Sequence, residues 1–150
     1  MVVAYEKFRA VRRQLNLVFT QNLKHLKIGP KQAIMLRHID TTGKCSLADL
    51  SRATVTDPAA VNRAVAAMIS RGLIDRHEHE TDHRCWQVSL SEKGKTMARE
   101  IEKIYARVAD VLVSPLTTEE RHSLLAILDK VAESITPQKS KRIKETAVKN

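Results

Sequence analysis

The residues best able to bind a metal lie together in one polar segment. Three histidines and three acidic residues gather there: His77, Glu78, His79, Glu80, Asp82 and His83. Imidazole and carboxylate groups are ligands for zinc or nickel, and alternation along a strand would place His77 and His79 on one face. Their spacing matches no closed metal motif, and a polar segment of this kind is typical of a solvated turn. We therefore expect no bound metal and no cofactor.

The two cysteines, Cys45 and Cys85, are the candidates for redox chemistry. A reactive thiol needs an activating cation nearby, and Arg84 beside Cys85 is the one such neighbour in sequence. We interpret Cys45 as a structural thiol and keep redox sensing through Cys85 as an alternative. With no Ser/His/Asp set and no glycine-rich phosphate loop, the sequence does not predict an enzyme.

A third group of residues suits nucleic-acid recognition. Asn62 and Arg63 follow the small residue Ala59 in the segment 58–71. A guanidinium can reach guanine or phosphate, an amide can pair with adenine, and small side chains permit close approach to a groove. The alternative is a solvated helix face with one arginine, so the assignment depends on the elements that carry these residues.

Composition favours one mainly α-helical domain with an appended element. The 150 residues are 43% hydrophobic, 29% charged and 3% aromatic, with four glycines, which disfavours an all-β fold. The longest apolar run has six residues, and the first residues lack the apolar core of a secretory signal. We expect a cytoplasmic protein with no membrane partner.

The formal charge of +9 is compatible with a nucleic-acid partner, yet it lies at the two ends of the chain. Residues 1–28 hold six Lys or Arg and one Glu, and residues 137–150 hold five and one. The segment 29–94 is almost balanced, with nine basic and eight acidic residues.

Two short helices with a tight polar turn are predicted in the balanced segment. Ser46 and Asp49 resemble a capping box, and the β-branched run 54–56 interrupts the helix that they start. Asp57 followed by Pro58 starts the next helix, which Gly72 ends. This arrangement is typical of a helix-turn-helix.

A β-hairpin follows the second of these helices. Residues 73–77 and 86–90 alternate as strands around a polar tip, and a helix-turn-helix followed by such a hairpin is a winged helix. Arg84 at the tip could read a narrow minor groove, and Asp82 could hold that arginine in place. An exposed ion pair is the alternative for these two residues.

Long amphipathic helices flank the winged helix. Apolar spacing predicts one helix over 5–26, another after Ser91, and a last one that Thr117 and Glu120 cap. A second copy of the chain is the simplest cover for their apolar stripes, so we expect a homodimer. The predicted organisation is a helical dimerisation region (1–28 and 95–136), a winged-helix DNA-binding domain (29–94) and a basic, disordered tail (137–150).

The chain resembles the MarR family of winged-helix regulators. The resemblance is carried, in order and at matching distances, by residues 57–63, 68–76, 82–84 and 90–94, which read DPAAVNR, MISRGLIDR, DHR and LSEKG. It implies a dimeric transcription factor on a pseudo-palindromic double-stranded DNA operator, usually a repressor and often released by a small-molecule effector.

The resemblance suggests two sets of candidate residues. Ser46, Arg52, Thr54 and Thr56, at the first helix of the helix-turn-helix and its turn, are expected to contact phosphates. With them, the predicted DNA-binding set is Ser46, Arg52, Thr54, Thr56, Ala59, Asn62, Arg63, Asp82 and Arg84. An effector pocket is expected where the first two helices meet the recognition helix, at Leu15, Phe19, Met35 and His38, with ordinary core packing as the alternative. A redox- or metal-responsive regulator, and a winged helix used for protein interaction or DNA architecture, remain the competing functions.

Overall fold

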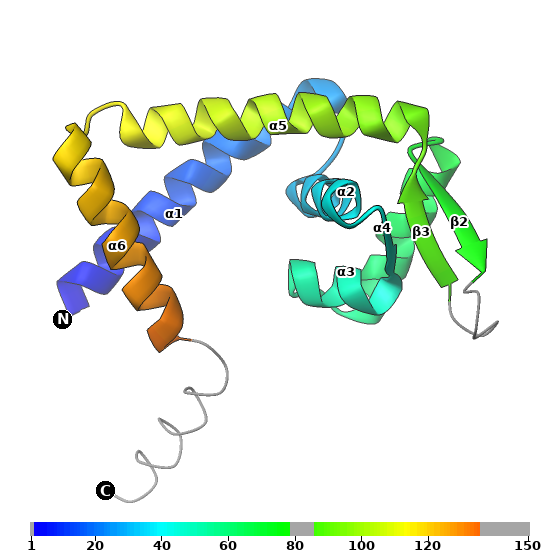
Figure 1. Ribbon diagram of the computed structural model, residues 1–150, viewed down its shortest axis with the longest axis horizontal. Helices are drawn as coiled ribbons and strands as arrows, with labels where there is room; N and C mark the ends of the chain where they lie inside the picture. The colour runs from blue at the N-terminus through cyan, green and yellow to red at the C-terminus, as the bar shows by residue number, and fades with distance from the viewer. Residues whose placement is uncertain (1, 79–85, 136–150) are drawn as a thin grey trace, which may run out of the picture. The chain divides into compact units, whose positions relative to one another are not determined.

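The computed structural model describes residues 2–78 and 86–135, which are mostly helical with a small antiparallel sheet (Figure 1). This confirms the predicted fold class. The elements are α1 (Val2–Leu23), a 3-10 turn (Lys24–Leu26), α2 (Pro30–Thr42), β1 (Lys44–Ser46), α3 (Leu47–Thr54), α4 (Pro58–Ser70), β2 (Ile74–Glu78), β3 (Trp86–Leu90), α5 (Glu92–Val113) and α6 (Thr118–Ser134). The chain divides into two compact units, residues 1–109 and 110–150. Among the described residues, no helix is both long and apolar enough to cross a membrane.

Local capping chemistry sets the start of three helices. The hydroxyl of Ser46 accepts the amide of Asp49 at 3.1 Å, and the carboxylate of Asp49 accepts the amide of Ser46 at 2.9 Å. The same reciprocal arrangement starts α6, and Asp57 caps α4 by accepting the amide of Ala60 at 2.9 Å. The predicted capping residues therefore hold these helices as expected.

The sheet has the strand order β1-β3-β2, and both pairings are antiparallel. Strands β2 and β3 form the predicted hairpin, with Ile74 opposite Leu90. Strand β1 was not predicted; its three residues pair with β3 so that Cys45 lies opposite Val88. This third strand ties the hairpin to the segment that leads into α3.

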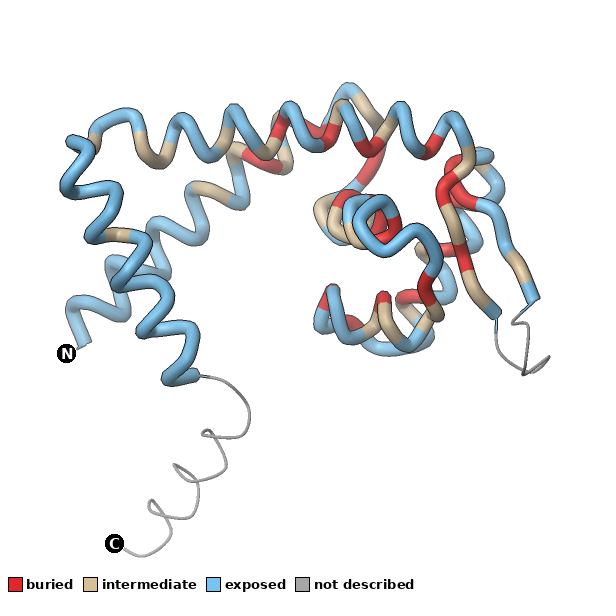
Figure 2. The backbone as a smooth tube through the Cα atoms, viewed as in Figure 1, coloured by how far each residue is buried: buried red, intermediate tan, exposed pale blue. Residues whose placement is uncertain are grey.

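Most of the core lies among α2, α3, α4, the sheet and the first half of α5 (Figure 2). Its fully buried large side chains are Leu23, Met35, Leu36, Ile39, Leu50, Met68, Leu73, Ile74, Ile101, Ile104, Val61 and Val88. Val61, Val65 and Met68 of α4 are buried, whereas Ile69 is 37% exposed. The buried stripe of α4 thus leaves out one of its large apolar residues.

Large apolar side chains also lie on the surface. Of the stripe predicted for the first helix, only Phe19 and Leu23 are buried, whereas Tyr5, Phe8 and Val11 are exposed. In the second unit, α6 has no buried residue and exposes Leu125, Ile127, Leu128 and Val131.

Candidate nucleic-acid interface

Helix α4 presents a polar outer face opposite its buried stripe. Asn62 and Arg63 are exposed, as are the small residues Ala59 and Ala66 beside them. Arg63 forms no ion pair within the described part of the chain, although it lies near enough to Asp57 to help stabilise that carboxylate. An unneutralised guanidinium on a face of small side chains can reach phosphates or base edges.

The N-terminus of α4 is fixed by Asp57. Chiefly because its carboxylate accepts the amide of Ala60, the pKa of Asp57 lies below its ordinary value. The helix therefore begins with an ionised cap across the physiological pH range, which favours one orientation of its first turn.

Helix α3 carries two further residues of the predicted DNA-binding set. The hydroxyl of Ser46 donates to Asp49 at 2.7 Å, and Arg52 forms an ion pair with the same carboxylate. Bonds from the side chain and backbone of Ser46, and then from Arg52, lower the pKa of Asp49. Ser46 is thus committed to its cap, whereas the guanidinium of Arg52 remains largely exposed.

The turn between α3 and α4 is built differently from our expectation. Thr54 and Thr56, expected to face phosphates, are 9% and 8% exposed. The hydroxyl of Thr54 donates to the carbonyl of Leu50 at 2.7 Å, and that of Thr56 donates to the carbonyl of Thr54 at 3.0 Å. Both hydroxyls therefore bond to backbone carbonyls of α3, and we remove these threonines from the interface.

The described part of the wing is anchored by side chains from both strands. The guanidinium of Arg76 lies 3.6 Å from the ring centroid of Trp86, and His77 shares a 2.7 Å hydrogen bond with Ser89. This cation–π contact stabilises the pairing of β2 with β3. Asp82 and Arg84, with their predicted minor-groove role, lie outside the described residues, as does Cys85.

A hollow of about 360 Å³ opens beside the helix-turn-helix. Its lining comes from α2, α3 and α5: Ile34, Arg37, His38, Thr41, Ala53 and Tyr105. Of the predicted pocket residues only His38 lines this hollow, since Met35 is fully buried and Leu15 is half-buried in α1. Phe19 is buried and lies behind the hollow, with its ring centroid 4.6 Å from that of Tyr105.

Arg37 and Tyr105 were missed by the sequence analysis. The guanidinium of Arg37 lies 4.4 Å from the ring centroid of Tyr105 and 2.8 Å from a carboxylate oxygen of Glu102. Burial raises the pKa of Tyr105, so its phenol stays protonated at neutral pH. The hollow therefore has an aromatic wall against which the Arg37 guanidinium packs, and Glu102 balances the charge of that guanidinium.

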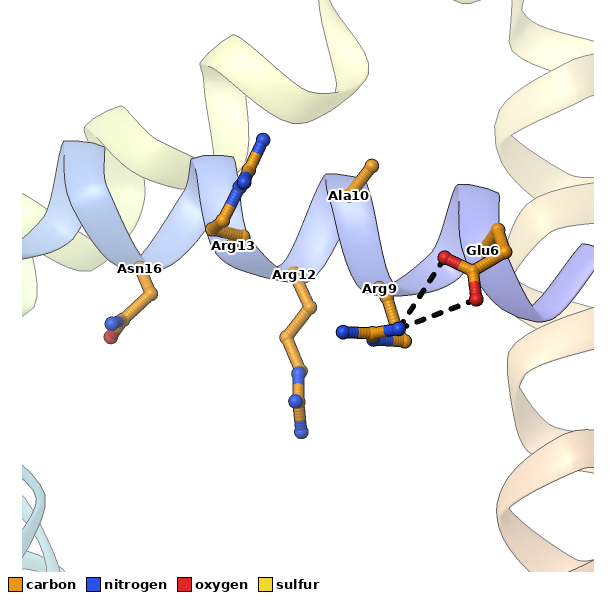
Figure 3. Close-up of a pocket in the computed structure, with 6 residues that line it drawn as sticks. All are labelled: Glu6, Arg9, Ala10, Arg12, Arg13 and Asn16. Atoms are coloured by element: carbon orange, nitrogen blue, oxygen red, sulfur yellow. Dashed lines mark hydrogen bonds and ion pairs between the residues drawn. The ribbon is translucent and has the colours of Figure 1, made fainter.

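A second, open concavity of about 620 Å³ lies along α1 (Figure 3). It is lined by Glu6, Arg9, Ala10, Arg12, Arg13 and Asn16, and Arg9 is paired with Glu6 at 3.3 Å. Arg12 and Arg13 make no ion pair within residues 2–78 and 86–135. This face is basic, but nothing in its geometry selects a particular anion.

The described residues favour neither redox chemistry at Cys45 nor a metal site. Burial, as the largest cause, raises the pKa of Cys45 to about 11, so its thiol is protonated and unreactive at neutral pH. No set of three metal-ligating residues occurs in the described ranges, which exclude His79 and His83.

A family model described as the MarR family matches residues 26–84. The HTH-type transcriptional regulator YwhA of Bacillus subtilis is 28% identical over 68% of this chain and 73% of its own length. The structure of an Escherichia coli MarR mutant complexed with operator DNA superposes with a TM-score of 0.74 at 21% identity, covering 84% of this chain and 91% of that one. Bordetella bronchiseptica BpsR, whose DNA binding is described as regulated by 6-hydroxynicotinic acid, gives 0.74 at 24% identity over 88% and 99%. The match to the MarR family model over residues 26–84 and the similarity to HTH-type regulators support a MarR-family winged-helix transcriptional regulator, and the solved structures share its fold.

Proposed function

We propose that this protein is a sequence-specific transcriptional repressor that binds a pseudo-palindromic DNA operator as a homodimer and responds to a small molecule. The observation that carries the proposal is the outer face of α4, where Asn62 and Arg63 are exposed and the guanidinium has no ion-pair partner among the described residues. The complex of E. coli MarR with operator DNA supports duplex DNA as the partner.

Selection from a random duplex library with the full chain tests sequence-specific binding. The selected duplex then serves in gel-shift titrations of wild type and Arg63→Ala. We expect the substitution to weaken binding about tenfold, because a bidentate contact from arginine to guanine contributes about 1–3 kcal/mol. Arg99→Ala removes the same charge from the exposed face of α5 and is the matched control.

The outcomes separate the competing functions. Equal losses of DNA affinity in Arg63→Ala and Arg99→Ala would indicate a general charge effect and would contradict base recognition by α4. Equal affinity for selected and random duplexes would favour a nonspecific architectural factor. A repressor further requires that adding the protein lowers transcription from a template that carries the selected sequence.

The exposed apolar side chains support the homodimer. Tyr5, Phe8 and Val11 are 63%, 53% and 48% exposed on α1, and α6 exposes a second apolar set. Such surface is large for a monomer and is the kind that a second copy covers. Sedimentation equilibrium should give twice the chain mass of 16.9 kDa, and a monomer at micromolar concentration would contradict the proposal.

The hollow beside Tyr105 supports the response to a ligand. Ala53 of α3 forms part of its wall, so a bound molecule would contact the helix that leads into the turn before α4. We expect 6-hydroxynicotinic acid, the compound named with BpsR, to be a useful first probe because it is flat and anionic. Release of DNA that disappears in His38→Ala would support this site, whereas release that persists would place the ligand elsewhere.

A further inference from the structure

Val55 adopts a backbone conformation that a valine rarely takes. It lies in the turn between α3 and α4 with φ 48° and ψ 52°, in the left-handed region. There the Cβ of an L-residue approaches the following carbonyl oxygen, and a branched Cβ makes the crowding worse. Glycine or asparagine would fit this position with less strain.

The side chain of Val55 does not contribute to the core. It is 91% exposed, more than any other large hydrophobic side chain among the described residues. The fold therefore holds an apolar, branched side chain in a strained conformation and leaves it in solvent.

The strain is maintained by the residues around Val55. The hydroxyl of Ser51 donates to the carbonyl of Thr56 at 2.5 Å, and the amide of Thr56 donates to the carbonyl of Ser51 at 3.1 Å. The hydroxyls of Thr54 and Thr56 add bonds to the carbonyls of Leu50 and Thr54 in α3. Strained residues that persist in such an over-determined setting cluster at functional sites.

From this combination we infer that Val55 is a further DNA-contacting residue, whose isopropyl group packs against the 5-methyl group of a thymine in the major groove. The inference rests on the proposed function. Val55 precedes the N-cap of α4 by two residues, and the N-terminal residues of a recognition helix lie closest to the base edges. Valine cannot bind phosphate, and the thymine methyl is the apolar group that the major groove exposes.

The test uses the full chain and the duplex selected from the random library. Val55→Gly removes the side chain, and Val55→Asn suits the left-handed conformation without an apolar group. We expect each variant to bind about fourfold more weakly per half-site, the effect of losing one methyl-sized apolar contact, while melting at the wild-type temperature or above it. Val55→Thr keeps the branched Cβ and one methyl, so it should lose less affinity.

Replacing each thymine of the duplex in turn by deoxyuridine removes one methyl group from the DNA. At one position per half-site, wild type should lose affinity while Val55→Gly loses none further. The inference is overturned if Val55→Gly binds like wild type, if its loss is the same on every deoxyuridine duplex, or if both turn variants melt well below wild type. Failure of the proposed function is distinct, because the library would then yield no preferred sequence and Arg63→Ala would have no effect.

Discussion

Replacing Gly94 with alanine should strongly destabilise the winged helix. Gly94 lies in the first turn of α5, where the helix passes close to the backbone just before β2. A Cβ at this position would lie 1.9 Å from the carbonyl oxygen of Leu73 and 3.0 Å from its carbonyl carbon. The two backbones would have to separate by about 1.5 Å to restore ordinary van der Waals contact.

Hydrogen bonds oppose that separation. The amide of Ser91 donates to the carbonyl of Leu73 at 3.1 Å, and its hydroxyl donates to the carbonyl of Gly72 at 2.6 Å. Alanine in a helix gains about 1 kcal/mol over glycine, but overpacking costs about 1–3 kcal/mol and each weakened bond about 1 kcal/mol. We expect a net loss of about 2–4 kcal/mol in the free energy of unfolding.

Urea unfolding followed by circular dichroism measures this loss of free energy. In a thermal scan, the melting temperature should fall by about 5–10 °C. Gly29→Ala is the matched control, because a Cβ at Gly29 meets nothing within 4 Å and φ is −87°. Because Gly29 is the N-cap of α2 and alanine is a poorer N-cap, the control should cost no more than about 1 kcal/mol. If Gly94→Ala were as stable as wild type, the close approach of α5 to Leu73 would be wrong.

Three further predictions concern the cap of α3, the buried thiol and the exposed face of α1. Ser46→Ala should cost about 1 kcal/mol of unfolding free energy, measured by urea titration, because it leaves the amide of Asp49 without its partner; an unchanged midpoint would contradict the cap. The pKa of Cys45 is about 11 in the folded state against an ordinary 9.0, so the folded state holds the thiol proton more tightly than the unfolded state does. The stability that this proton contributes is complete below pH 9 and is lost between pH 9 and 11. Cys45→Ala should therefore show a shallower loss of stability across that window in parallel urea titrations, and identical slopes would refute the assignment. Phe8→Lys should shift the sedimentation equilibrium from dimer toward monomer, because Phe8 is 53% exposed on the apolar face of α1, and an unchanged dimer would exclude that face from the interface.

Features set by neighbouring residues could be predicted from the sequence. The capping box of α3 and the Asp57 cap of α4 depend on residues three positions apart, so their chemistry is visible in the chain. The helical spacing of α4 places Arg63 on the face opposite Val61 and Val65, with Asn62 at the flank of that face.

Features made by distant segments could not be predicted in the same way. Strand β1 has three residues, and its identity comes from pairing with β3, more than 40 positions along the chain. Arg37 reaches Glu102 and Tyr105 across more than 60 positions, so neither helix alone shows the hollow. The direction of the hydroxyl groups in the turn was also hidden, because a threonine between two helices can face solvent or its own backbone.

The near-neutral charge of the winged helix follows from how its helices begin. Two of its carboxylates, those of Asp49 and Asp57, accept backbone amides at the N-termini of α3 and α4. There the positive end of the helix dipole offsets their charge, and Arg52 offsets that of Asp49 further. These two acidic residues therefore hold the starts of their helices and count little against an anionic partner, whereas Arg63 on the outer face forms no ion pair with any described residue. The balanced sum of charges thus understates the attraction that α4 can offer to DNA, and the basic residues at the ends of the chain add a long-range contribution that salt screens.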